Sequence, residues 1–118
     1  MTTATHAHLD IQNLDAVGAQ LRLEWTELAA ILGVDQSTLW RWRRGESRPR
    51  PLAQSRLAQL GELLEMLRRL FAGPDLAREW LHTARPEMLG GTETPLAVMR
   101  TGRIDRVLTV LHFLARGG

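Results

Sequence analysis

Residues 25–45 read WTELAAILGVDQSTLWRWRRG, and this stretch contains two short segments with the apolar spacing of a helix. Thr26 can cap the first helix, which we predict over residues 27–32. Gly33 follows at once, and glycine adopts without strain the left-handed conformation that often ends a helix. Asp35 can cap the next helix, so only a tight turn separates the two segments.

The second helix is predicted over residues 36–44, and Gly45 ends it. Four apolar side chains at helical spacing can pack the two helices together: Leu28, Leu32, Leu39 and Trp42. Two helices joined in this way form a helix-turn-helix unit, whose second helix enters the major groove of DNA. An ordinary helical hairpin is the alternative interpretation.

The turn and the end of the second helix carry a family resemblance. A Leu-Gly-Val turn occupies residues 32–34, and residues 42–45 are Trp, two polar residues and Gly. In these features the stretch resembles the Xre-type helix-turn-helix repressors. The resemblance implies that the chain binds double-stranded DNA.

Helical phase places one face of the second helix away from the core. On this face, Gln36 could pair with adenine and Arg41 with guanine, each through two hydrogen bonds. Ser37 and Thr38 are short donors suited to a phosphate or a base edge. For Trp40 two roles remain open, contact with a thymine methyl or sugar, or packing on the first helix.

Positive charge is concentrated directly after these residues. All fifteen basic residues of the chain are arginine and the net charge is +2, yet residues 41–50 hold five Arg and one Glu. A local basic patch is a candidate phosphate contact, and a solvated loop is the alternative. Four of its arginines are better placed for phosphates than for bases: Arg43, Arg44, Arg48 and Arg50.

A long helix is predicted over residues 52–72, after a stiff connector with Pro49 and Pro51. Apolar residues spaced 3, 4, 3 and 4 apart give it a seam like that of a coiled coil: Leu57, Leu60, Leu64, Leu67 and Phe71. Because one helix-turn-helix unit makes few contacts, such units usually dimerise on two half-sites. We therefore expect a homodimer through this seam or a neighbouring surface, and the alternative is that the seam is ordinary core.

Short helices separated by Gly and Pro fill the rest of the chain, and the last is predicted over residues 103–116. Its buried stripe has helical spacing: Ile104, Val107, Leu108, Leu111, Leu114 and Ala115. No segment alternates with period two. The sequence therefore predicts an all-α fold, with a helix-turn-helix, a long helix and a small C-terminal helical region.

The second half carries its own resemblance, in motifs that occur in a fixed order: Trp80, Arg85-Pro86, Leu89-Gly90-Gly91, Thr94-Pro95-Leu96, Thr101-Gly102, Val107 and Leu111. Together with the first half, this order resembles the Xre/MbcA/ParS-type antitoxins of RES-Xre toxin–antitoxin systems, over about residues 10–116. The resemblance implies a RES-domain toxin as partner, an NAD-consuming enzyme whose active-site entrance the antitoxin covers. The chain departs from the family in having almost no tail beyond its last helix.

This reading divides the chain into four segments: a mobile leader (1–9), a helix-turn-helix DNA-binding region (10–51), a long connecting and dimerisation helix (52–74) and a helical toxin-binding region (75–118). On the last helix Arg106, Val110 and Phe113 lie opposite the buried stripe, as interface residues do. Packing of this face on other helices is the alternative. Three more arginines could reach an acidic toxin surface or the anionic part of an NAD-binding cleft: Arg100, Arg103 and Arg116. Arg116 could instead balance the helix dipole.

Several classes of protein are disfavoured. The absence of Cys excludes disulfides, thiolate zinc sites and cysteine nucleophiles. No apolar run is long enough for a membrane span, and no signal peptide is visible, so we expect a cytoplasmic protein. His6 and His8 make a poor metal site, and no catalytic motif is present. We expect no metal, no cofactor and no enzymatic activity.

The favoured hypothesis is an antitoxin that neutralises its toxin and, as a dimer, represses its own operon. One alternative is a plain Xre-type repressor whose C-terminal half only dimerises. Another is an adaptor that no longer binds DNA and uses residues 41–50 for a protein partner.

Overall fold

The computed structural model describes residues 14–91 and 93–117, without the side chains of residues 16, 17 and 87. The described residues form eight α-helices and no strand, which confirms the predicted all-α class. The helices are α1 (Leu14–Leu21), α2 (Trp25–Leu32), α3 (Gln36–Arg43), α4 (Pro51–Leu70), α5 (Pro74–Leu81), α6 (Pro86–Leu89), α7 (Pro95–Arg100) and α8 (Ile104–Ala115). The predicted mobile leader, with His6 and His8, lies outside the described residues.

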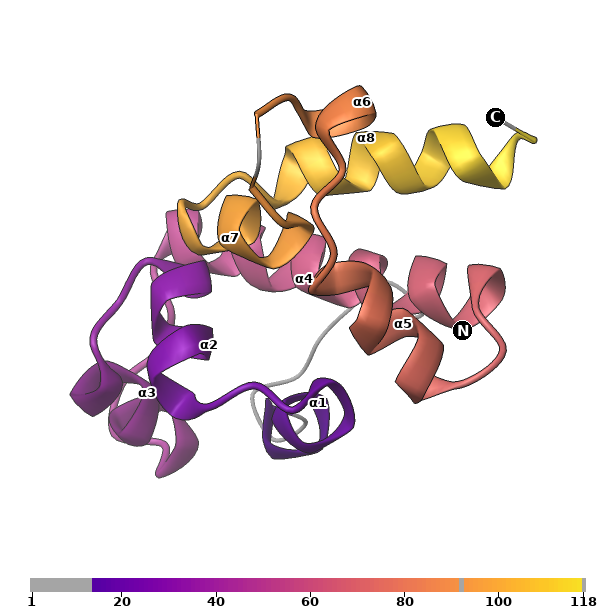
Figure 1. The fold of residues 1–118 in the computed structure, drawn as a ribbon. Coiled ribbons are helices and arrows are strands. Elements are labelled where there is room, and N and C mark those ends of the chain that lie inside the picture. The colour runs from indigo at the N-terminus through magenta and orange to yellow at the C-terminus, as the bar shows by residue number, and fades with distance from the viewer. Residues whose placement is uncertain (1–13, 92, 118) are drawn as a thin grey trace, which may run out of the picture.

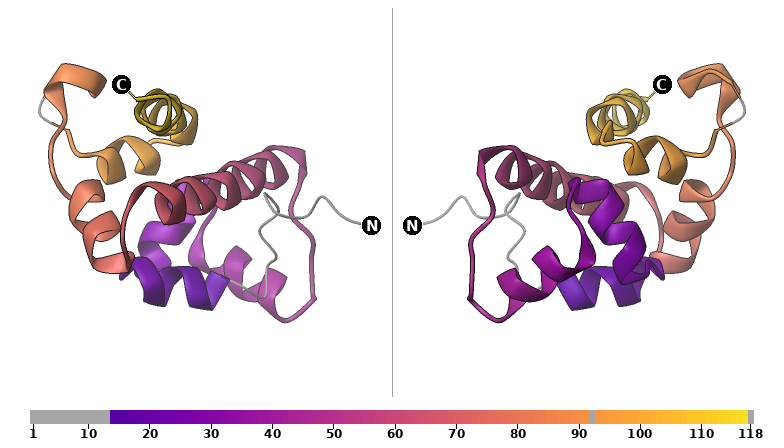
Figure 2. Two further views of the ribbon diagram at one scale, coloured as in Figure 1. Left: turned by 90° about the vertical axis from the view of Figure 1, so that its right-hand side faces the viewer. Right: turned by 90° about the vertical axis from the view of Figure 1, so that its left-hand side faces the viewer.

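The long helix α4 is the centre of the molecule (Figure 1). In the two turned views α4 lies between the group α1–α3 on one side and α8 on the other (Figure 2). It packs along α8 and also contacts α2 and α5. Pro51 occupies its first turn, where the missing N–H of proline costs no hydrogen bond.

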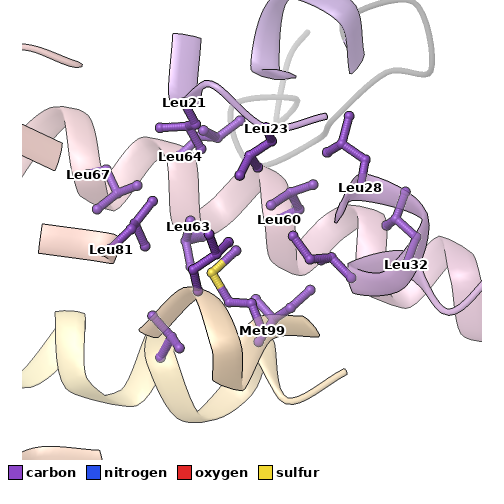
Figure 3. Packing of buried hydrophobic residues seen from close by; sticks show 14 of the residues in the cluster. Leu21, Leu23, Leu28, Leu32, Leu60, Leu63, Leu64, Leu67, Leu81 and Met99 are labelled. Atoms are coloured by element: carbon purple, nitrogen blue, oxygen red, sulfur yellow. The ribbon is translucent and has the colours of Figure 1, made fainter. Parts of the chain in front are cut away.

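Most apolar side chains of α4 are buried within this single chain. Leu60 and Leu63 have no accessible surface, and Leu57, Leu64 and Leu67 are also buried. Figure 3 shows leucines of α1, α2 and α5 gathered around α4, with Met99 of α7 close by.

The seam predicted for dimerisation is therefore core, which corrects that prediction. Leu57, Leu60, Leu64 and Leu67 are covered by other helices of the same chain, so a second copy cannot reach them. Phe71 is half-buried, and its ring lies 5.9 Å from that of Trp80. Homodimerisation stays a prediction, and it requires a different surface.

The first and second halves of the chain share this core. Helix α7 packs on α2, and α5 packs on α1. Arg100 at the end of α7 forms an ion pair with Glu27 in the first turn of α2, with Nη1 and Oε2 3.2 Å apart. Helix α2, which leads into the turn before α3, is thus contacted by both α4 and α7.

The start of α2 differs from the prediction. The helix begins at Trp25, and Glu24 rather than Thr26 is its capping residue. The Glu24 backbone N–H donates to the carboxylate of Glu27 over 3.4 Å. The side chain of Glu24 in turn accepts from the backbone N–H of Glu27, so the two residues form a capping box. Thr26 is exposed in the first turn of the helix.

Candidate functional site

Helices α2 and α3 are joined by residues 33–35, as predicted. Gly33 has φ +75°, the left-handed conformation expected at the end of α2. Its N–H and that of Val34 donate to the carbonyls of Ala30 and Ala29, over 3.2 and 3.0 Å. The last carbonyls of α2 are satisfied in this way, so the chain can turn sharply into α3.

Asp35 caps α3, which confirms its predicted role. Its carboxylate accepts three hydrogen bonds, from the Thr38 N–H at 2.9 Å, the Thr38 hydroxyl at 2.7 Å and the Ser37 hydroxyl at 3.0 Å. These bonds lower the pKa of Asp35, the side-chain bond from Thr38 having the largest effect. The carboxylate therefore fixes the first turn of α3.

The cap also changes the roles available to the polar residues of α3. The hydroxyls of Ser37 and Thr38 donate to Asp35, and the Thr38 oxygen accepts a hydrogen bond from Arg41 at 3.1 Å. Gln36 and Arg41 are exposed, and no acidic residue pairs with either within the described part of the chain. These two side chains remain the best placed to contact base edges.

Trp40 packs on α2 and is still 40% exposed, so its contact with DNA stays a prediction. Its ring stacks on that of Trp25, with centroids 5.4 Å apart and planes inclined by 27°. The guanidinium of Arg43 lies over both rings, 5.1 Å from the centroid of Trp40, and also pairs with Asp15 of α1. Arg43 thus supports the aromatic stack in addition to carrying surface charge.

A hollow of about 440 Å³ lies beside α3 and the connector that follows it. Arg41, Arg48 and Arg50 line it, together with the exposed side chain of Leu52. The other lining residues belong to the α2–α3 turn, α3, the connector and the start of α4: Leu32, Gly33, Val34, Thr38, Trp42, Ser47 and Ala53. Two exposed arginines, Arg48 and Arg50, beside a partly apolar hollow suit a phosphate ester that carries a sugar.

The arginines of the basic patch are not equivalent. Arg44 forms an ion pair with Glu46, with Nε and Oε2 3.1 Å apart, while Arg48 and Arg50 form none with any described residue. Leu52, which the sequence did not point to as part of this site, is 66% exposed beside these two arginines. The signal in the sequence that could have indicated Leu52 is an apolar residue directly after Pro51, in the first turn of a helix.

Only part of the face predicted for a partner on α8 is exposed. Phe113 is 45% exposed, as expected of an interface residue, but Val110 is only 7% exposed and belongs to the core. Arg106 donates through Nη2 to the carbonyl of Leu89 at the end of α6. The expectation that Val110 is exposed is thus wrong, because helical phase alone does not reveal which sides of α8 other helices cover.

Two of the other predicted interface arginines are engaged inside the chain. Arg100 pairs with Glu27, and Arg103 binds Asp105 through Nε and Nη2, both at 3.0 Å. This pairing raises the pKa of Arg103 and lowers that of Asp105. Arg116 is exposed directly after the last turn of α8, so Phe113 and Arg116 are the predicted contacts that remain accessible.

Other kinds of site find little support in the described residues. Nowhere in residues 14–91 and 93–117 do three His, Asp or Glu side chains gather where they could hold a metal ion. Within the same residues, none of the helices combines the length and the apolar character needed to cross a membrane.

No family model matches the sequence, and a search of curated proteins finds no match. Among solved structures, the fold is similar to that of a chain in the crystal structure of the M. tuberculosis MbcT-MbcA toxin-antitoxin complex. The match has a TM-score of 0.65 and 22% sequence identity, and it covers 91% of this chain and 94% of that chain. The likeness establishes that the two chains share one fold along almost their whole length.

Proposed function

We propose that this chain is an antitoxin that binds and neutralises a RES-domain, NAD-consuming toxin and represses its own operon by binding operator DNA as a dimer. The observation that carries the proposal is the fold shared with a chain of a toxin-antitoxin complex over 91% of the molecule. The sequence motifs of the two halves, which resemble those of Xre/MbcA/ParS-type antitoxins in order, support the same function.

The DNA-binding role rests on α3 and the hollow beside it. With α3 in a major groove, Gln36 and Arg41 face the base edges. Arg48 and Arg50 bind the sugar–phosphate backbone in the hollow, next to Leu52. Arg44 adds a weaker phosphate contact because Glu46 competes for its charge.

The toxin-binding role rests on the end of α8. Phe113 is an exposed aromatic residue, the type that contributes strongly to protein interfaces, and Arg116 lies one turn further on. Helices α4 and α6 cover other sides of α8, so the surface available to a toxin is narrow. Its exposed residues are Asp105, Thr109, Phe113 and Arg116.

The test compares two exposed apolar residues of similar accessibility. Phe113→Asp should weaken binding of the toxin encoded beside this gene by at least about tenfold, as loss of an interface hot spot does, while DNA binding and Tm stay unchanged. Leu76→Asp, on the exposed side of α5, is the control and should change none of the three. Equal toxin affinity of both variants and the parent would place the toxin site elsewhere.

A plain repressor is the second candidate function, and one observation favours it. Arg100, Arg103 and Arg106 all bind groups of the same chain, as expected where the C-terminal half serves the fold alone. This candidate predicts tight operator binding with no protein partner encoded beside the gene.

A further inference from the structure

Arg56 connects the two halves of the chain through a pair of glycines. This half-buried residue of α4 places its guanidinium against Gly33 at the end of α2 and against Gly102 after α7. A Cβ at position 33 would lie 1.9 Å from Nη1 of Arg56, and a Cβ at position 102 would lie 2.7 Å from Nη2. The planar group therefore occupies a slot that exists because both residues lack a side chain.

Electrostatics favours a cation at this place. Gly33 is the C-cap of α2, and Gly102 lies two residues beyond Arg100, the last residue of α7. The carboxyl end of a helix carries a partial negative charge, so the guanidinium lies beside two such ends at once. No acidic side chain pairs with Arg56 within residues 14–91 and 93–117.

Both turns are also set by backbone hydrogen bonds beside the slot. The Val34 N–H donates to Ala29 over 3.0 Å, and the Arg103 N–H donates to Val98 over 3.4 Å. Each bond closes the end of one of the two helices against which Arg56 lies. The exchange rates of these two amides therefore report on each side of the slot separately.

We propose that Arg56 is a positioning residue that couples the α7–α8 turn to the α2–α3 turn, so that the placement of α3 depends on the C-terminal half. Its consequence for DNA binding rests on the proposed function; the coupling itself does not. A protein bound to the C-terminal half would act on α3 through this side chain. Because the guanidinium ends a flexible side chain, a methyl group at either glycine displaces Arg56. Both glycines have a positive φ, so alanine also strains the backbone there, and the control must share that strain.

The first test measures amide hydrogen exchange in the full-length protein. Gly102→Ala should raise exchange at the Val34 amide by about tenfold, the scale of a local opening, although position 102 belongs to the other half. Gly45→Ala is the matched control, because Gly45 has a similar φ, +76° against +86°, and ends its helix with the same pair of backbone hydrogen bonds. Open space lies where its Cβ would be. Gly45→Ala should leave exchange at Val34 unchanged.

Arg56→Ala, alone and combined with Gly102→Ala, gives a double-mutant cycle that measures the coupling between the two positions. Arg56→Ala alone should raise exchange at both Val34 and Arg103, and Gly102→Ala should then add nothing further at Val34. The Leu60 amide in α4 serves as the reference for global unfolding and should not change. Unchanged exchange at Val34 in Gly102→Ala, with faster exchange at Arg103, would overturn the coupling.

The second test uses a DNA duplex from the region upstream of the gene. Gly102→Ala removes no charge, and it should lower the affinity several-fold without changing the slope of log K against log salt. Arg56→Ala should also leave that slope unchanged; a slope smaller by about 0.9 would make Arg56 a phosphate contact instead. Parental affinity of Gly102→Ala would overturn the positioning role. If the parent binds no DNA, the proposed function fails while the exchange experiment still decides the coupling.

Discussion

Asp35 is the residue on which the geometry of α3 depends most directly. Its pKa lies below the ordinary value of 3.8 in the folded state, because Thr38 and Ser37 donate hydrogen bonds to the carboxylate. A depressed pKa contributes stability that is present above the unfolded value and is lost as the pH falls through the folded value. Asp35→Ala should therefore lower Tm by a few degrees at pH 7, roughly what the loss of a cap costs a domain of this size.

The measurement is thermal unfolding followed by circular dichroism at several pH values. The difference in Tm between the parent and Asp35→Ala should persist down to about pH 4. It should then shrink at lower pH, where the parent loses the same interaction by protonation. A difference that is constant from pH 7 to pH 2 would show that the carboxylate does not stabilise the turn.

Arg41 and Arg48 allow base recognition to be separated from phosphate binding. Arg41→Ala should reduce the preference for operator over random DNA, because it removes the group that faces guanine. Arg48→Ala should weaken both DNAs to the same extent and reduce the salt slope by about 0.9. Binding isotherms at several salt concentrations measure both effects. If neither variant differs from the parent, α3 does not enter the groove.

At the residue scale, the sequence predicts features that depend on near neighbours in the chain. The roles of Gly33 and Asp35 were predictable, because the C-cap of one helix and the N-cap of the next depend only on the residues around them. Val110 was not, since helical phase places it away from the stripe of α8, while tertiary packing buries it in the core. The contact partners of Arg106 and Trp40 depend on the same kind of tertiary packing.

Among the elements, α4 has the largest share of the core. Leu60→Ala should lower the free energy of unfolding by about 2–5 kcal/mol, the cost of a cavity at a fully buried leucine. Leu52→Ala, on the exposed start of the same helix, should stay within about 0.5 kcal/mol of the parent. Urea unfolding of the two variants gives both values. A small effect at Leu60 would mean that α4 is not the centre of the core.

The seam of α4 is an apolar stripe that periodicity predicts, but periodicity does not predict what covers it. The spacing of Leu57, Leu60, Leu64 and Leu67 correctly indicates an apolar stripe on a long helix. The same spacing serves a coiled coil and an internal core equally well. Only the packing of α2, α5 and α8 around α4 shows that the chain covers the stripe itself.

For the whole molecule, the shared core implies cooperative unfolding. Helix α7 packs on α2 and α8 packs on α4, so neither half can lose its structure without exposing apolar surface of the other. We predict one thermal transition with the same midpoint by far-ultraviolet circular dichroism and by tryptophan fluorescence. Fluorescence reports mainly on the first half, where three of the four tryptophans lie. Two separate midpoints would show that the halves fold independently.

The all-α class and most helices follow from periodicity and punctuation by Gly and Pro, but the docking of the two halves does not. Periodicity shows which face of a helix is apolar, and it does not name the helix that covers it. The Arg100–Glu27 pair, formed between residues 73 positions apart, is an example. The proposed surfaces for DNA and toxin both lie on helices that pack on this shared core.

The most direct measurement of the central claim is a growth assay with the genes that neighbour this one. We predict that one neighbouring gene, expressed alone, stops growth and depletes cellular NAD⁺, and that co-expression of this chain restores both and yields a stable complex of the two proteins. Unaltered growth and NAD⁺ with every neighbouring gene, and recovery of this chain without a partner, would contradict the antitoxin function.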